Sequence, residues 1–311
     1  MKRTFWTMKV ALFLGLGSFG WGAVGGPDRV ALATYNVENY LLTRTGDRLA
    51  KSEASKAAVA RLLKAVNADV VALQELGGLE ALDDLCRRMG ALGLEYPHRE
   101  WVRGYDTNIQ VALVSRFPIV ARRPHTKETY LLSGRRFHVS RGFLEVDLRI
   151  GSDYLLTVWV AHLKSRRTAV QADQADMRLE EARILRGLLD ERLREAPRAN
   201  VVVLGDLNDT KDSPSIRALM GRGSGRLVDA RPSERNGDTG FTPNPRWQPR
   251  TIAWTHYYGV EDTYSRVDYA LLHPNAAREW KASESYVATV PDWGVASDHR
   301  PVVVVLEPRD R

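Results

Sequence analysis

Acidic, amide and histidine side chains follow directly after several apolar runs of this sequence. In VVVLGDLNDT (201–210), a β-branched run leads into Asp206 and Asn208. The run has the length and composition of a buried strand, and Gly205 marks its end. Taken alone, the segment favours a strand followed by an Asn/Asp turn. Whether this segment is a simple turn or part of a functional site depends on the residues at the other strand ends of the chain.

Five further apolar runs are followed or closed by polar residues of the same kind. They carry Asn36 and Glu38 in YNVEN, Gln74 and Glu75 in LQEL, His162 in VAHLKS, Asp268 in SRVDYAL, and Asp298 with His299 in SDHRPV. Binding sites of α/β proteins lie at strand ends, so six such ends favour convergence at one edge of a sheet sandwich. Carboxylates, amides and imidazoles gathered there are suited to bind a hard cation and to move protons.

The elements that must position these residues alternate between strands and helices after Pro27. The apolar runs predict strands at 30–35, 68–76, 108–120, 142–150, 154–165, 201–204, 266–273 and 299–307. Apolar residues at helical spacing predict helices at 53–67 and at about 170–195, and Ser213-Pro214 is typical of a helix start. Because no repeat or linker interrupts the chain, we predict one α/β domain over 28–311.

Residues 221–250 differ from the rest of the chain. They are rich in glycine, proline and arginine and lack periodicity, which predicts a long surface loop. The loop carries arginines at 222, 226, 231, 235, 246 and 250. These side chains either contact a polyanion or are simply solvated.

Length and composition are those of a globular protein. The 311 residues are 44% hydrophobic and 27% charged, which allows a large core and excludes wholesale disorder. The formal net charge of +7 and a pI of about 9.5 suit an anionic partner. Cys86 is the single cysteine, so the chain can form no internal disulfide and has no cysteine–histidine zinc cluster.

The N-terminus has a basic start followed by an apolar, glycine-containing run. This pattern predicts a secretory signal peptide over residues 1–25, with small Ala23 and Gly25 suited to cleavage. An uncleaved membrane anchor is the alternative, but the uninterrupted apolar stretch is shorter than the ~20 residues that span a bilayer. We expect a secreted or periplasmic protein without stable membrane insertion after cleavage.

The ordered motifs resemble those of the endonuclease/exonuclease/phosphatase superfamily, which includes secreted deoxyribonucleases, apurinic endonucleases, neutral sphingomyelinases and inositol polyphosphate 5-phosphatases. The matching pieces span residues 35–303 in the family's order: YNVEN, LQE, VALVSRFPI, RGFLEVDL, HLKS, GDLND, RVDYAL and SDHRPV. The resemblance implies an α/β four-layer sandwich, with two mixed β-sheets packed face to face and flanked by helices. It also implies phosphoester hydrolysis that depends on Mg²⁺ or Mn²⁺.

The resemblance assigns roles that fit the chemistry, because water attacks an anionic phosphoester only with a hard cation, a base and hydrogen-bond donors. Glu75, Asn36 and Asp298 are implied as metal ligands. His299 is implied as the general base, since an imidazole titrates near neutrality. Asp268 is implied to orient His299.

Further residues are implied to act on the phosphate itself. Asp206 would orient or help to deprotonate the attacking water, and Asn36 and Asn208 would donate their amides to phosphate oxygens. His162 would stabilise the transition state or protonate the leaving oxygen; a strand-end histidine satisfied by a backbone carbonyl is the alternative. Three candidates for substrate binding complete the set: Asn108, Arg141 and Tyr105. For Arg141, a salt bridge at a strand start is the alternative.

These features lead to one main functional hypothesis. We expect an exported metal-dependent nuclease with nucleic acid as substrate, because the positive charge and the arginine-bearing loop favour a polyanion. A phosphodiesterase or phosphatase for a lipid or small-molecule head group, similar to sphingomyelinase, is the alternative. A catalytically inactive binding module is disfavoured, because Glu75, Asp206, His162 and His299 are all present. We expect a monomer.

Overall fold

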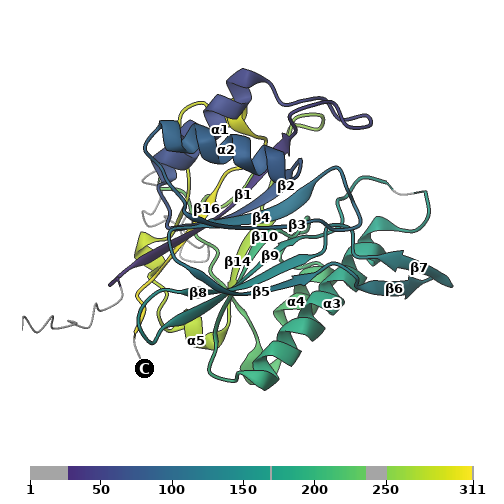
Figure 1. Ribbon diagram of the computed structural model, residues 1–311. Coiled ribbons are helices and arrows are strands. Elements are labelled where there is room, and N and C mark those ends of the chain that lie inside the picture. Colours follow the sequence, from purple (N-terminus) through teal and green to yellow (C-terminus); the bar gives the residue numbers. More distant parts are fainter. Residues whose placement is uncertain (1–26, 169, 236–250, 310–311) are drawn as a thin grey trace, which may run out of the picture.

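Two six-stranded mixed sheets pack face to face in a computed structural model that describes residues 27–168, 170–235 and 251–309 (Figure 1). The first sheet has the order β15 (Tyr286–Val287), β16 (Val302–Leu306), β1 (Val30–Tyr40), β2 (Val70–Leu76), β4 (Gln110–Ser115) and β3 (His98–Val102). The second has the order β11 (Val228–Asp229), β14 (Asp268–Leu272), β10 (Asn200–Asp206), β9 (Leu155–His162), β8 (Phe143–Arg149) and β5 (Ile119–His125).

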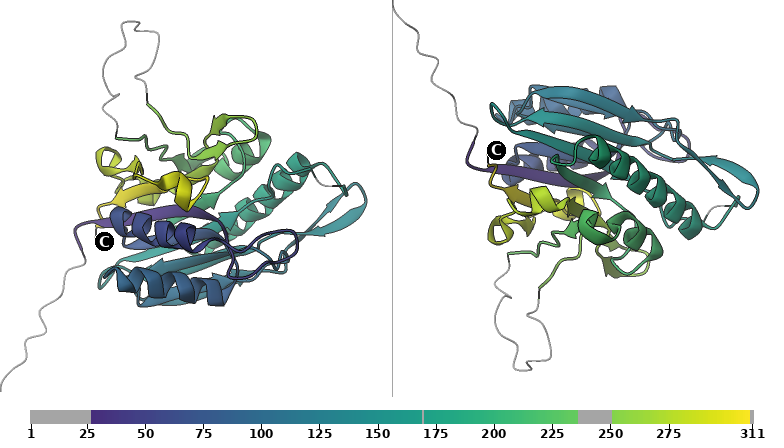
Figure 2. Two further views of the ribbon diagram at one scale, coloured as in Figure 1. Left: turned by 90° about the horizontal axis from the view of Figure 1, so that it is seen from above. Right: turned by 90° about the horizontal axis from the view of Figure 1, so that it is seen from below.

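Helices cover the outer face of each sheet, which completes the predicted four layers (Figures 1 and 2). The first sheet packs against α1 (Glu53–Val66), α2 (Leu79–Ala91) and the short α6 (Trp293–Ala296). The second sheet packs against α3 (Gln174–Glu195) and α4 (Pro214–Met220). A further short helix, α5 (Pro274–Ala277), follows β14. The fold class expected from the sequence is therefore confirmed.

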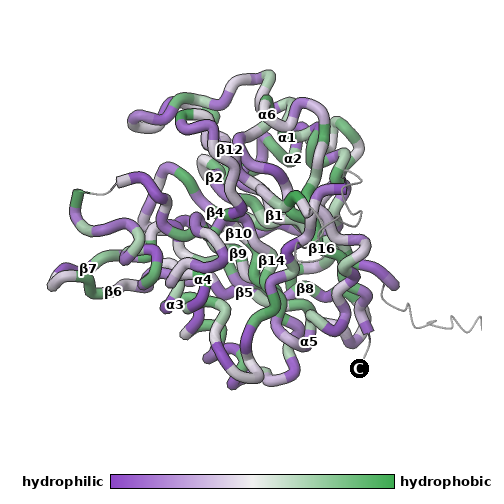
Figure 3. Tube along the Cα trace, turned by 180° about the vertical axis from the view of Figure 1, so that it is seen from behind, coloured by the Kyte–Doolittle hydropathy of each residue, from purple (hydrophilic) through white to green (hydrophobic). Residues whose placement is uncertain are grey.

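The central strands are apolar because both of their faces are buried. Valine and leucine side chains of β1, β2, β9 and β10 fill the space between the sheets, and alternate residues of the same strands face the helices. In Figure 3 hydrophobic stretches follow β1, β8 and β14. Burial on both faces explains why these strands read as continuous apolar runs in the sequence.

Three predicted elements have different boundaries in the structure. The expected strand at 108–120 is two strands in opposite sheets, β4 and β5, because Pro118 ends the ladder and the chain crosses over there. The helix expected from about 170 begins at Gln174, since the Asp173 side chain accepts hydrogen bonds from the N–H groups of Ala175 and Asp176. The expected loop at 221–250 contains β11, and its residues 236–250 lie outside the described range.

Two hairpins were not predicted from the sequence. β6 (Thr129–Leu132) pairs with β7 (Arg135–His138), and β12 (His256–Tyr258) pairs with β13 (Thr263–Ser265). The β6–β7 hairpin projects from the body of the molecule beyond α3 (Figures 1 and 2). Its strands are only four residues long and, apart from the buried Tyr130, their side chains are half-buried or exposed, so they lack the apolar pattern that reveals a core strand.

The predicted signal peptide, residues 1–25, lies outside the described residues. Among the residues that are described, no helix has the length and apolar character needed to cross a membrane.

Candidate active site

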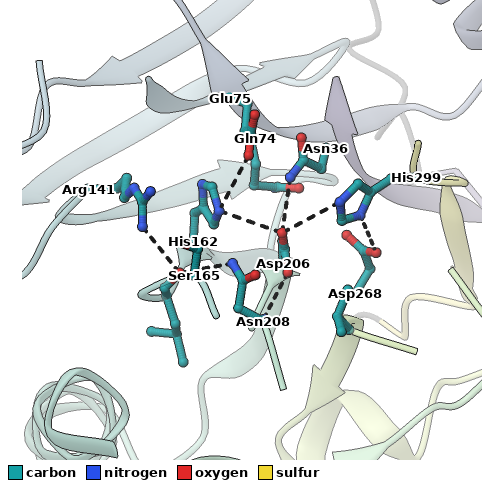
Figure 4. A network of polar contacts seen from close by, with 12 residues as sticks. Asn36, Gln74, Glu75, Arg141, His162, Ser165, Asp206, Asn208, Asp268 and His299 are labelled. Carbon is teal, nitrogen blue, oxygen red and sulfur yellow. Dashed lines mark hydrogen bonds and ion pairs between the residues drawn. The ribbon is translucent and has the colours of Figure 1, made fainter. Parts of the chain in front are cut away.

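The strand directions bring the polar strand ends to one edge of the sandwich. β1 runs parallel to β2 and β9 parallel to β10, and a hydrogen bond from Asn36 of β1 to Asp206 of β10 shows that all four strands end at the same edge. β14 and β16 run antiparallel to their neighbours and therefore begin there. In the register of the second sheet, Asp206 is opposite both His162 and Asp268. Figure 4 shows the resulting network of side chains from both sheets.

The backbone at this edge is unusual. Glu75 has a φ of 65°, and Glu38 and Asn39 have φ values of 44° and 47° at a break in the register between β1 and β2. Non-glycine residues rarely adopt this left-handed conformation, which concentrates at functional sites. The Asn39 N–H donates to Glu75 Oε2 at 2.9 Å, and this bond holds the Glu75 carboxylate in place.

Gly205 is required by the close approach of β9 and β10. Its φ is 155°, and a Cβ atom at this position would lie 1.9 Å from the carbonyl oxygen of Ala161. Any side chain would push β10 away from β9. The glycine that precedes Asp206 in GDLND therefore sets the distance between Asp206 and His162.

His299 and Asp268 form a buried pair. The Nδ1 atom of His299 lies 2.8 Å from Asp268 Oδ2, and both residues are buried. Burial by itself would lower the pKa of His299, but the Asp268 carboxylate outweighs burial and raises this pKa to about 10. The Ser297 hydroxyl accepts the His299 N–H and donates to the carbonyl of Asn36, which ties the pair to the end of β1.

Asp206 lies at the centre of the network, with one oxygen close to both histidines. Its Oδ2 is 3.6 Å from His162 Nε2 and 3.9 Å from His299 Nε2, and it accepts a hydrogen bond from Asn36 Nδ2 at 3.0 Å. Its Oδ1 accepts the Asn208 N–H at 2.8 Å. Burial, followed by the charge of Asp268, raises the pKa of Asp206 to about 7.

His162 is buried without a hydrogen-bond partner in the described part of the chain. Both of its ring nitrogens are unpaired, and Nε2 lies 3.6 Å from Asp206 and 3.9 Å from Glu75 Oε1. Burial, together with the positive charges of Arg141 and His299, lowers the pKa of His162 well below its usual value. The alternative role for His162, in which it donates a hydrogen bond to a backbone carbonyl, is therefore not observed among the described residues.

Each predicted metal ligand contacts a different member of the network, and the donor types fit a hard cation: Glu75 lies 3.9 Å from His162, Asn36 3.0 Å from Asp206 and Asp298 3.8 Å from His299. Glu75 and Asp298 offer carboxylate oxygens and Asn36 an amide oxygen, which are the ligands that Mg²⁺ and Mn²⁺ prefer. Beside them, the buried His162 nitrogens and Gln74 Nε2 have no hydrogen-bond partner among the described residues, as expected where a further polar group belongs.

Two combinations of side chains at this edge have ligand atoms close enough to hold a metal ion. Among the described residues, His256, Asp298 and His299 form one group and Asp206, Asp268 and His299 the other, each with its ligand atoms within 4.8 Å of one another. His256 Nε2 lies 3.6 Å from Asp298 Oδ2. Burial favours a higher pKa for Asp298, but the contact with His256 outweighs it and lowers this pKa. His256 was not predicted, because nothing in the sequence places β12 next to SDHRPV.

The predicted amide donors are partly engaged within the protein. Asn36 donates to Asp206, and Asn208 Nδ2 donates to the Leu163 carbonyl at 3.0 Å. Each amide nitrogen carries two hydrogens, so each retains one for a ligand.

The three predicted substrate-binding residues lie at the border of the network. Arg141 is buried, with Nε 3.5 Å from Asp106 Oδ2 and Nη1 3.4 Å from the Leu163 carbonyl, so the salt bridge considered as its alternative role is present. Asn108 donates its backbone N–H to Asp106. Tyr105 is 67% exposed and stacks on His138 with ring centroids 4.3 Å apart. Tyr105 is thus outside the central cluster.

Two buried residues of α3 support the site and were not predicted. Glu181 accepts hydrogen bonds from the N–H and hydroxyl of Ser140 and from the N–H of Lys164, at 2.7–2.9 Å. Arg178 donates to Asp209 Oδ2 at 2.9 Å and to the Lys164 carbonyl at 3.0 Å. Both lie on the side of α3 that faces the sheet. In the sequence, these two charged residues fall among the apolar positions of the helix. This pattern is the sequence feature from which their burial could have been predicted.

The chain belongs to the Endonuclease/Exonuclease/phosphatase family, whose model matches residues 33–299. It is a hydrolase that acts on phosphoester bonds, and enzymes of this family typically depend on a divalent metal. The family predicted from the motifs is therefore confirmed. Comparison with curated protein sequences gives no match.

Solved structures share the fold at low sequence identity. Sphingomyelinase C from Streptomyces griseocarneus has a TM-score of 0.59 at 19% identity, over 89% of this chain and 99% of that one. Beta toxin from Staphylococcus aureus has a TM-score of 0.61 at 17% identity, covering 88% and 99%. Truncated TDP2 from Caenorhabditis elegans has a TM-score of 0.58 at 17% identity, covering 90% and 98%. These similarities establish the fold and leave the substrate open.

Proposed function

We propose that this protein is an exported, Mg²⁺- or Mn²⁺-dependent nuclease that cleaves phosphodiester bonds of nucleic acid. The observation that carries the chemistry is the placement of two histidines on either side of Asp206, one ion-paired and one unpaired. Without Lys2, Arg3 and Lys9 of the predicted signal peptide the formal net charge falls from +7 to +4, and this modest positive charge supports an anionic polymer as substrate.

His299 and Asp206 would act on the attacking water. His299 Nε2 faces the site while Nδ1 is held by Asp268, so Nε2 is the atom that accepts the proton. Asp206, whose oxygen lies between the two histidines, would orient the water by accepting a hydrogen bond from it. Asp268 would then stabilise the imidazolium that forms.

His162 would act at the opposite side of the phosphate. Its unpaired Nε2 can donate a hydrogen bond to a phosphoryl or leaving oxygen that enters the site. Arg141, whose charge acts on His162, adds positive potential there. The free amide hydrogens of Asn36 and Asn208 would contact phosphate oxygens without repelling them.

Glu75, Asn36 and Asp298 would hold the divalent cation. When bound, Mg²⁺ or Mn²⁺ supplies positive charge that polarises the phosphoryl group and lowers the pKa of a neighbouring imidazole towards neutrality.

A lipid phosphodiesterase is the second candidate, and one observation favours it. The projecting β6–β7 hairpin carries Leu131 with 64% exposure, which would suit contact with a membrane. Arg135 and Arg136 on the same hairpin are also exposed and suit either a nucleic acid or an anionic lipid.

A substrate panel separates the two candidates. Purified enzyme is assayed on single-stranded DNA, duplex DNA, RNA, sphingomyelin vesicles and bis-p-nitrophenyl phosphate, each with Mg²⁺, Mn²⁺, Ca²⁺ or EDTA. We expect nucleic acid cleavage that EDTA abolishes. Ready hydrolysis of sphingomyelin with DNA and RNA left intact would rule out the nuclease.

Export is a separate part of the proposal. If residues 1–25 form a cleaved signal peptide, the mature protein begins after about residue 25 and is found in the periplasm or the medium. Intact-mass spectrometry of the expressed protein tests this directly. A full-length product in the membrane fraction would instead support an anchor.

A further inference from the structure

A basic hollow lies between α3 and α4, outside the catalytic network. The two helices lie side by side on the outer face of the second sheet (Figure 1), and the hollow between them has a volume of about 820 Å³. Its cationic lining residues are Arg183, Lys211, Arg217, Arg222 and Arg226. We call this feature the α3–α4 groove.

Three of these cations are free to bind a ligand. Within the described part of the chain, Arg217, Arg222 and Arg226 are exposed and none has a carboxylate at ion-pairing distance, whereas Arg183 pairs with Glu180. The two acidic residues that line the groove do not cancel this charge. Asp229 is bound by both terminal nitrogens of Arg266, at 3.0 and 2.6 Å, and Asp212 lies 4.0 Å from Lys211.

The far wall of the groove is held in a defined conformation. Arg186 of α3 donates to the carbonyl oxygens of Leu219, Met220 and Gly225 at 3.1–3.5 Å. Gly221 has a φ of 70°, and a Cβ atom there would lie 2.5 Å from the Arg186 guanidinium. Arg222 and Arg226 therefore extend from a turn that is anchored to α3.

The groove begins close to the catalytic edge. Asn208 belongs to the catalytic network, and Lys211 of the groove follows it by three residues. Arg166 donates to the Asn208 carbonyl at 3.1 Å, and its half-exposed guanidinium lies 3.7 Å from Asp209 Oδ1. The short segment 208–211 thus connects the catalytic network directly to the lining of the groove.

We propose that the α3–α4 groove binds the phosphate backbone of a nucleic acid on one side of the bond that is cleaved. This inference rests on the proposed nuclease function and assigns it a second binding site. α4 is about 10 Å long, the distance over which one strand of a B-form duplex advances along the helix axis by about three phosphates. A concave surface between two helices suits a polymer strand better than the flat surface of a membrane.

Neutralising the three free arginines should change the salt dependence of binding in a calculable way. Each phosphate contact contributes about 0.7 to the slope of log affinity against log salt for a single strand. Loss of three contacts lowers the slope by about 2, so between about 50 and 200 mM salt the wild type should lose about 16-fold more affinity than the variant.

The test compares two triple variants with equal loss of charge. One carries Arg217→Gln, Arg222→Gln and Arg226→Gln. The control carries Arg61→Gln, Arg194→Gln and Arg198→Gln, which are exposed arginines outside the groove. Binding of a fluorescent single-stranded oligonucleotide is followed by anisotropy in EDTA, so that cleavage does not interfere. Turnover of bis-p-nitrophenyl phosphate with Mg²⁺ shows whether the catalytic centre is intact.

We expect the groove variant to lose affinity and salt dependence while its turnover of the small ester is unchanged, and the control to bind like the wild type. Equal binding and equal slopes in all three proteins would overturn the groove and leave the nuclease proposal standing. A wild type that neither binds nor cleaves DNA or RNA would overturn the nuclease itself. Binding to anionic vesicles but not to oligonucleotide, lost in the groove variant, would overturn the nucleic-acid assignment.

Discussion

Replacement of Asp268 by Asn is the sharpest test of the catalytic arrangement. The substitution keeps the shape of the side chain but replaces the carboxylate, which lies 2.8 Å from His299 Nδ1, by a neutral amide. With its NH₂ group towards Nδ1, the amide makes Nδ1 the acceptor and moves the ring proton to Nε2, which then cannot take a proton from water. With its oxygen towards Nδ1, the amide keeps the tautomer, but the negative charge that stabilises the imidazolium is still lost.

The size of the effect follows from the burial of the pair. Breaking a buried, hydrogen-bonded ion pair is worth about 3–5 kcal/mol. If this loss falls on the transition state, turnover drops by about 10²–10⁴-fold, at 1.36 kcal/mol for each factor of ten. The substitution also removes the largest of the charges that raise the pKa of His299 to about 10, so this pKa should fall, while Asp206 and Asp298 still oppose the effect of burial.

The assay measures turnover of bis-p-nitrophenyl phosphate at saturating Mg²⁺, and histidine NMR of the metal-free protein reports the pKa of His299. Asp176→Asn, an exposed change on α3, is the matched control and should leave both values unaltered. Turnover of Asp268→Asn within threefold of the wild type, together with an unchanged pKa for His299, would refute the assignment of the pair.

Three further predictions concern the metal, the support of the site and pH. Glu75→Gln should raise the Mg²⁺ concentration needed for half-maximal activity at least tenfold, with activity recovering at high Mg²⁺; an unaltered Mg²⁺ titration would exclude Glu75 as a ligand. Glu181→Gln should lower the free energy of unfolding by about 1–3 kcal/mol, because its NH₂ group would face N–H donors of Ser140 or Lys164; Glu180→Gln is the more exposed control for the urea titration. The metal-free protein should lose stability as pH rises from about 7 to 10, because the raised pKa of His299 stabilises the folded protein below about pH 6.5 and this contribution is lost as pH rises to about 10. Below pH 6.5 the raised pKa of Asp206 and the lowered pKa of His162 act with opposite signs. A urea midpoint that increases between about pH 7 and 9 would contradict this sign.

The core elements were predictable because burial on both faces leaves a continuous apolar run. The strands β2, β10 and β16 and the helix α1 fall within a few residues of the predicted ranges. The sequence also shows Pro118, which ends a strand, but it does not show that the chain crosses to the other sheet at this residue. Only the packed structure shows that the strands on either side of this proline belong to opposite sheets.

The sequence by itself determined the family and the residue types at the strand ends, because each lies directly after an apolar run and keeps the family's order. It could not determine which side chains meet across the two sheets. That depends on strand register, on the approach of β9 to β10 at Gly205, and on the left-handed backbone at Glu75. Likewise, Glu181 and Arg178 appear in the sequence as charges on a helix, and only tertiary packing buries them against the loops that they hold. The α3–α4 groove has the same origin, because arginines from α4 and from the following turn become one basic surface only when the turn is anchored to α3.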